Sequence, residues 1–166
     1  QFSALEANVK MADSFENFAA GQQEERILRG ANLLGKQVFA QGVAMDQPGG
    51  VPLDGVVQLE QIVDNLKLYV VDAETDQIVN EQDLGPQLTG EVAFGWNGGD
   101  LDGEAAAPGK YLFKAVGYVG DDNFEVPAMA QAKITGVSWD ESLGEMFVEI
   151  ADGRAIALSK ISHISE

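Results

Sequence analysis

The segment 95–111 contains the residues whose types and spacing come closest to a chemical site. It begins Gly-Trp-Asn-Gly-Gly-Asp-Leu-Asp-Gly and ends Pro-Gly-Lys-Tyr. A calcium loop of the EF-hand type has acids at positions 1, 3 and 5 and Glu at position 12. With Asp100 and Asp102 at positions 3 and 5, Gly98 falls at position 1 and Gly109 at position 12. Because both anchoring carboxylates are then missing, the pattern favours a tight turn followed by a hairpin loop, with calcium binding as the lesser alternative.

The remaining residue types argue against catalysis and against a bound cofactor or metal. The single histidine, His163, lies three residues from the C-terminus, and the chain has no cysteine. Zinc and iron sites therefore lack ligands, and no Gly-x-Ser-x-Gly turn occurs that would present a serine nucleophile. Neither a phosphate-binding P-loop nor a dinucleotide fingerprint is present. We therefore predict a protein that is not an enzyme and that has no catalytic residues, metal site or cofactor.

Adjacent acids offer one competing hypothesis, a carboxylate hydrolase of glycosidase type. Such an enzyme needs two carboxyl groups facing each other across a cleft. The adjacent pairs are Glu24-Glu25, Asp121-Asp122 and Asp140-Glu141. With 27 acidic residues in a chain of 166, such pairs also arise by chance and then mark solvated loops.

The charge balance excludes two classes of partner. Ten Lys and Arg residues stand against 27 Asp and Glu residues, which gives a net charge of −17. Nucleic acid is bound by cations that displace counterions from phosphates, and anionic lipid headgroups repel a negative surface. We therefore predict neither nucleic acid nor a membrane as a partner.

The first 34 residues predict a helix, because their apolar residues recur at steps of three and four. Gly21 interrupts the pattern, and Gly35 is a natural stop. An isolated amphipathic helix needs something to cover its apolar face: its own domain, a partner helix lost with the truncation, or a partner helix from another subunit. The candidate self-association face consists of Phe2, Leu5, Val9, Phe15, Phe18, Ile27 and Leu34.

From Lys36 onward the apolar period changes to two, which is typical of strands. The alternating sets are Leu66, Leu68 and Val70; Val92, Phe94 and Trp96; Tyr111, Phe113 and Ala115; and Met146, Val148 and Ile150. Asp152-Gly153 between two short alternating runs indicates a hairpin whose favoured turn has positive φ at both central residues. Many short strands separated by turn residues predict an all-β sandwich or barrel.

Dense turn formers at 46–55 indicate a domain junction, and Pro127 marks a second one. The piece between them is somewhat short for an immunoglobulin-type sandwich. The flanking pieces, 36–50 and 132–164, are each too short to fold alone. We expect them to close a small barrel together, which would make the middle domain an insertion.

Four motifs, in this order along the chain, resemble those of the flagellar hook-capping proteins. They are Gln-Phe-Ser-Ala-Leu-Glu at 1–6, Ala-Asn-Leu-Leu-Gly-Lys-Gln-Val at 31–38, the Trp-Asn-Gly to Pro-Gly-Lys-Tyr run at 96–111, and the Ile-Thr-Gly-Val to Ile-Ala-Leu tail ending at Ile161. Asn97 stands where the family has Asp, and the family's N-terminal export region is missing, so that the chain looks like a truncation. The motif residues singled out are Asn32, Leu33, Leu34, Gly35, Trp96, Gly98, Asp102, Gly103, Pro108, Gly109 and Tyr111.

The resemblance implies a mainly β fold: a fibronectin type III-like sandwich (56–131) inserted into a small tudor-like barrel (35–55 with 132–166), after a helical segment (1–34). It also implies a non-enzymatic scaffold that caps the growing bacterial flagellar hook and promotes assembly of hook protein subunits. The expected partners are hook protein and further copies of the same chain. The expected location is extracellular, at the distal end of the hook, after export by the flagellar type III apparatus.

A different class of function stays open beside this one. Trp-Asp-Gly and Pro-Gly-x-Tyr runs also occur in secreted sandwich modules that bind carbohydrate or a surface protein. That hypothesis requires Trp96 to be exposed on a groove rather than buried.

Overall fold

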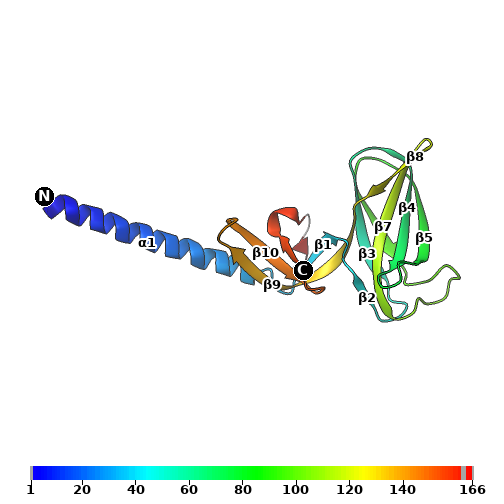
Figure 1. Cartoon of the computed structure of the whole chain (residues 1–166), viewed down its shortest axis with the longest axis horizontal. Helices are drawn as coiled ribbons and strands as arrows, with labels where there is room; N and C mark the ends of the chain where they lie inside the picture. Colours follow the sequence, from blue (N-terminus) through cyan, green and yellow to red (C-terminus); the bar gives the residue numbers. More distant parts are fainter. Residues whose placement is uncertain (1, 162–163, 166) are drawn as a thin grey trace.

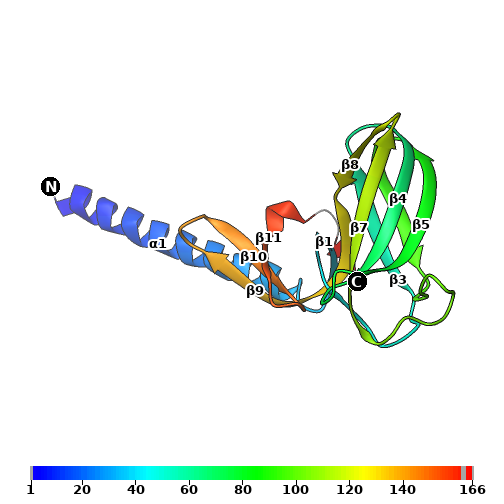
Figure 2. The same cartoon turned by 45° about the vertical axis from the view of Figure 1, so that its right-hand side comes forward.

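The computed structural model describes residues 2–161 together with residues 164 and 165 (Figures 1 and 2). His163 and Gln1, both considered above, lie outside the described residues. The chain is mainly β, with one N-terminal helix and two antiparallel sheets. The elements are α1 (Phe2–Ala31), β1 (Gln37–Gln41), β2 (Met45–Gln47), β3 (Leu53–Leu59), β4 (Val63–Asp72), β5 (Ile78–Gln87), β6 (Gly90–Trp96), β7 (Gly109–Val119), β8 (Asp122–Val126), β9 (Ala128–Asp140), β10 (Glu145–Ile150), β11 (Ala155–Ala157), a 3₁₀ turn (Leu158–Lys160) and β12 (Ile164–Ser165).

Helix α1 is continuous for 30 residues, and the expected interruption at Gly21 is wrong. A single glycine costs a helix about 1 kcal/mol relative to Ala, and the strong helix formers Gln, Glu and Arg follow it. The helix ends at Ala31, and the chain turns into β1 through residues 32–35. Gly35 closes that turn with φ of +80°, the left-handed conformation that suits glycine after a helix, and its N–H donates to Ile134 O at 2.9 Å.

The two antiparallel sheets pack face to face where β3 and β6 lie over β4 and β7. One sheet has the order β2-β7-β4-β5, with β8 beside the second half of β7. The other has the order β11-β10-β9-β1-β12, and β3 and β6 extend it from β9. Aromatic rings of β6 and β7 meet between the layers, with the Phe94 and Phe113 centroids 4.7 Å apart. Figure 1 shows this sandwich at one end and α1 projecting from the other.

Strand β9 connects the two parts of the molecule. Its first residues pair with β3, residues 129–133 pair with β1, and residues 134–140 pair with β10. Strand β1 also pairs with β12, so the last strands of the chain join the segment that follows α1. The two β parts therefore share one 13-residue strand.

The alternating runs occupy strands as the sequence predicts, with one face buried. Leu66, Leu68 and Val70 of β4 are completely buried, and Tyr111, Phe113 and Ala115 of β7 lie opposite them in the same core cluster. Period-two alternation works here because successive side chains of a strand point to opposite faces of the sheet.

Two details of the sequence prediction are wrong. Residues 45–47 were expected in the barrel portion 35–55, but they form β2, which pairs with β7 of the sandwich; β3 also begins early, at Leu53. The hairpin at Asp152-Gly153 exists, but only Gly153 has positive φ, at +88°. Its N–H donates to Ile150 O, so the loop is a tight turn followed by a left-handed glycine rather than the two-residue turn expected.

Candidate interaction surface

The loop between β6 and β7, residues 97–108, is held by its own backbone. Trp96 donates from its indole Nε1 to Gly99 O at 2.8 Å, and Tyr111 donates from its hydroxyl to Ala107 O at 2.6 Å. The two rings pack edge to face with centroids 5.3 Å apart. Gly98 and Gly103 both have positive φ. The aromatic residues of the motif therefore anchor the two ends of this loop.

An acidic residue of the loop also helps to hold the loop backbone in place. One carboxylate oxygen of Asp100, Oδ1, accepts hydrogen bonds from the backbone N–H groups of Asp102 and Glu104, both at 2.9 Å. Asp102 is exposed. Within the described residues no group of three or more His, Cys, Asp or Glu side chains could hold a metal ion. The arrangement is that of an acid capping a turn.

Burial of Trp96 removes the basis of the carbohydrate-binding hypothesis. Only 1% of this residue is exposed, because the ring lies between the layers of the sandwich. The hypothesis required an exposed ring on a groove, and that requirement is not met.

The adjacent acids do not face one another across a cleft in the described part of the chain. Glu24-Glu25 lies on α1, Asp121-Asp122 at the β7–β8 turn and Asp140-Glu141 at the β9–β10 turn. Asp140 caps its own turn, and the hydroxyl of Ser142 together with the backbone N–H of Leu143 holds the pKa of Asp140 below its usual value.

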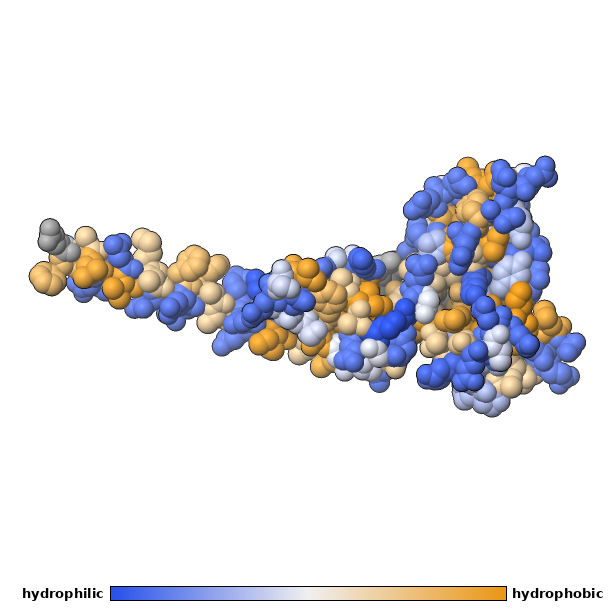
Figure 3. All heavy atoms as spheres, viewed as in Figure 1, coloured by the Kyte–Doolittle hydropathy of each residue, from blue (hydrophilic) through white to orange (hydrophobic). Residues whose placement is uncertain are grey.

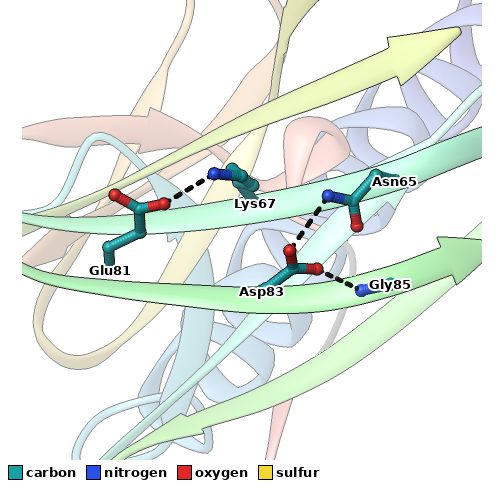
Figure 4. Close-up of polar contacts among 5 residues, drawn as sticks. All are labelled: Asn65, Lys67, Glu81, Asp83 and Gly85. Carbon is teal, nitrogen blue, oxygen red and sulfur yellow. Dashed lines mark hydrogen bonds and ion pairs between the residues drawn. The ribbon is translucent and has the colours of Figure 1, made fainter. Parts of the chain in front are cut away.

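Polar side chains also cover the outer face of β4 and β5 (Figure 4). Lys67 Nζ lies 2.7 Å from a carboxylate oxygen of Glu81, and this hydrogen bond raises the pKa of Lys67. Asp83 accepts from the amide of Asn65 and from the N–H of Gly85, which lowers the pKa of Asp83. Asn65 and Lys67 of β4 thus pair with Asp83 and Glu81 of β5 across the two strands.

Helix α1 carries eight of the 16 large hydrophobic residues that are exposed in the described part of the chain. In Figure 3, hydrophobic residues gather over its first half, farthest from the sandwich. Phe2 is 89% exposed and Phe15 is 73% exposed, and among the described helix residues Gly30 alone is buried. The seven residues of the candidate self-association face, Phe2, Leu5, Val9, Phe15, Phe18, Ile27 and Leu34, are all exposed. Within the described helices, none combines the length and apolar character needed to cross a membrane.

The base of α1 packs on the β9–β10 hairpin. The guanidinium carbon of Arg26 lies 4.3 Å from the centroid of the Trp139 ring, a cation–π contact. Gly30 faces Val137 so closely that a Cβ at this position would lie 2.9 Å from Val137 Cγ1. Beside this contact, Ile27, Gly30, Leu34, Val137 and Met146 line part of an apolar groove of about 380 Å³. The exposed apolar surface of α1 therefore continues onto the hairpin.

The sequence analysis does not predict a surface role for Arg26 or Trp139, and it assigns Met146 only to a strand. Trp139 and Val137 alternate along one strand, a signal that was available, but nothing in the sequence shows that this strand face meets the end of α1. Asn32, Leu33, Leu34 and Gly35 lie together in the turn after α1, far along the chain from the motif residues at 96–111, which the sandwich holds. Pro108 and Gly109 lead from the loop into β7. The structure thus places the motif residues in two separate clusters.

Replacing Gly30 tests how closely the end of α1 packs against Val137 of β9. We expect Gly30→Ala to destabilise the chain by about 1 kcal/mol, because crowding against Val137 costs roughly 1–3 kcal/mol and outweighs the better helix propensity of Ala. Gly21→Ala is the matched control, since a Cβ added there would have no atom within 4 Å. That control is expected to increase helicity in circular dichroism and to leave the urea midpoint unchanged or higher. Equal stabilisation by both substitutions would contradict a close contact at Gly30.

Comparisons with known proteins agree with this architecture. Residues 43–121 match the family model of the FlgD Ig-like domain. The structure of FlgD from P. aeruginosa is 26% identical with a TM-score of 0.65, and the match covers 80% of this chain and 98% of that one. FlgD from Xanthomonas campestris, whose structure was described for its insights into hook capping, is 21% identical with a TM-score of 0.66, covering 84% and 99%. No curated protein matches the chain significantly. The resemblance that the sequence motifs predict is confirmed.

Proposed function

We infer that this chain is a hook-capping protein of the FlgD type, a non-enzymatic scaffold at the distal end of the growing bacterial flagellar hook. Its role would be to promote the assembly of hook protein subunits there. The observation that carries the proposal is the likeness to FlgD structures over nearly their whole length, with 26% identity to one of them.

The surface chemistry is consistent with a scaffold. A cap must hold on to neighbouring subunits through contacts that can be released, and it needs apolar surface outside its own core. Helix α1 offers that surface among the described residues. We propose the exposed apolar residues of α1, together with Leu34 in the turn that follows it, as the self-association face and the hook protein as the second partner.

We also propose the domain division that the resemblance implies. A fibronectin type III-like sandwich would be inserted into a tudor-like barrel formed by β1, β9, β10, β11 and β12. The pairing of β1 with β9 and β12 supports this division, and β2 shifts the start of the sandwich to about residue 43, where the family match begins. Export by the flagellar type III apparatus and an extracellular location complete the proposal.

Deleting the gene in its source bacterium tests the function directly. The expected result in electron microscopy is basal bodies that end at the rod, with hook protein released into the medium. Hooks should return when the intact gene is supplied. Normal hooks in the deletion strain would refute the cap role and leave the fold as the only conclusion.

A further inference from the structure

Two grooves flank the end of α1 where it packs on β9 and β10 (Figures 1 and 2). The first is the apolar groove described above, to which Ile27 and Leu34 of the self-association face contribute. The second has a volume of about 730 Å³, and Arg29 and Ser159 contribute to it. At about 100° per residue, Ile27 and Arg29 point to nearly opposite sides of the helix. The lining of the second groove includes none of the seven residues proposed for self-association, so this groove can take a different partner.

The floor of the second groove is apolar and partly exposed. Leu33, Met146 and Leu158 line it, and each of the three is half-buried. Leu33 and Leu158 also pack against the hydrophobic core, which fixes their positions. A concave apolar surface of fixed shape is suited to an apolar side chain of a binding partner. The second groove therefore offers a preformed contact for such a side chain.

The rim of the second groove is positive in a chain that is otherwise strongly acidic. Among the described residues that line it, Arg26 and Arg29 stand against a single acid, Glu145. The carboxylate of Glu145 already accepts a hydrogen bond from the hydroxyl of Ser159. Arg29 forms an exposed ion pair with Glu25. Because the whole chain has a net charge of −17, this local excess of arginine favours a partner that brings a carboxylate to the groove.

Arg26 is held in one orientation while its N–H groups have no acceptor in the described part of the chain. Its guanidinium carbon lies over the Trp139 ring, 4.3 Å from the centroid, and this contact orients the guanidinium. Glu141 lines the first groove beside Arg26, but no ion pair or hydrogen bond joins the two. A guanidinium has five N–H donors in a planar fork that matches the two oxygens of a carboxylate. Because Trp139 already restricts the side chain, Arg26 loses less conformational entropy when it binds such a group.

We propose that the second groove docks a segment of a hook protein subunit that presents a carboxylate beside an apolar side chain. The carboxylate binds the guanidinium of Arg26, and the apolar side chain lies on Leu33, Met146 and Leu158. The groove and the self-association face occupy different sides of α1, so one copy can contact a neighbouring copy and a hook subunit at the same time. The proposal rests on the cap function and deepens it, because it names the surface that meets the hook protein.

The test measures the binding of purified hook protein monomers from the source bacterium to the whole 166-residue chain by titration calorimetry. We expect Arg26→Glu to weaken binding at least about tenfold, since it replaces a charged hydrogen bond by repulsion between carboxylates. Arg26→Lys keeps the charge but loses the planar fork, so it should weaken binding less. Lys10→Glu is the matched control, because it makes the same charge change at an exposed position nearer the start of α1. Its affinity should stay within about twofold of that of the natural chain.

A second pair of variants tests which groove the hook subunit occupies. Of the two grooves, Ser159 lines the second and Gln23 lines the first, and both residues are exposed. Ser159→Trp places a bulky ring in the second groove and should abolish binding. Gln23→Trp places the same ring beside the first groove and should leave the affinity unchanged. Far-ultraviolet circular dichroism checks that each variant is folded.

The proposal is overturned if hook protein does not bind the natural chain, or if it binds Arg26→Glu as tightly as the natural chain. Equal losses for Lys10→Glu and Arg26→Glu would overturn it too, because net charge and not the groove would then decide the affinity. A loss confined to Gln23→Trp would place the hook subunit in the first groove instead. The gene deletion separates this inference from the function. Normal hooks in the deletion strain would remove the cap role even if binding depends on Arg26, whereas missing hooks that an Arg26→Glu gene fully restores would leave the cap role without this docking groove.

Discussion

Trp96→Ala is expected to lower the free energy of unfolding by about 3–5 kcal/mol, the cost of truncating a large buried aromatic side chain. Trp96 is among the largest fully buried side chains of the described residues. Its ring contacts Tyr111 and Phe113 of the opposite sheet, with centroids 5.3 and 6.5 Å away. The substitution removes this packing and also the indole N–H that holds Gly99 O.

Urea unfolding followed by far-ultraviolet circular dichroism measures the effect without depending on tryptophan fluorescence. Trp96→Phe keeps an aromatic ring and loses the N–H donor, so it should cost less, with about 1 kcal/mol of the loss due to the hydrogen bond. Trp139→Ala is the control for removing a tryptophan, because that ring is only half-buried and contacts Arg26. A loss of less than about 1 kcal/mol for Trp96→Ala would contradict an anchoring role.

The part of the fold that depends on local pattern could be predicted from the sequence. Leu66, Leu68 and Val70 alternate with polar residues, and the strand places that face in the core as expected. Glycines at 98 and 103 predict a loop with unusual backbone angles, and both have positive φ. These predictions succeed because strand period and turn chemistry involve neighbours in the sequence.

The part of the fold that depends on pairing between strands distant in the chain could not be predicted from local sequence patterns. Residues 45–47 look like the end of one domain, and only the pairing of Met45 with Tyr111 shows that they belong to the sandwich. Strand β9 continues past the junction expected near Pro127 and serves both β parts. Partner choice for a strand is decided across the whole fold, so turn density alone misplaces a boundary.

The candidate surface was half visible in the sequence. Spacing of Phe2, Leu5 and Val9 identifies an exposed apolar stripe, and these residues are exposed on α1. Phe15 and Phe18 are assigned to the same stripe in the sequence analysis, but at about 100° per residue they point to a different side of α1 from Phe2 and Val9. The contact between Gly30 and Val137 joins two segments more than a hundred residues apart in the chain, so the sequence pattern does not predict it.

The second large effect is expected at Gly98. We predict that Gly98→Ala destabilises the chain by about 2–4 kcal/mol through two separate causes. Its φ of +80° is left-handed, which costs other residues roughly 1–2 kcal/mol. A Cβ would also lie 2.7 Å from the carbonyl carbon of Gly50 and 2.9 Å from Val51 N, and these are backbone atoms that cannot rotate away.

Gly103→Ala separates the two causes. Its φ is +84°, but nothing lies within 4 Å of the position of its Cβ, so it should show only the backbone cost of about 1–2 kcal/mol. The backbone near Gly98 is itself fixed, because Gln47 is buried and its amide oxygen accepts from Gly49 N and Val51 N while its amide nitrogen donates to Val51 O. A clear excess for Gly98→Ala in urea unfolding therefore measures the contact between the loop after Trp96 and the loop after β2. Equal losses would mean that residues 48–51 shift freely, and the Trp-Asn-Gly motif would then shape its own turn without joining the two loops.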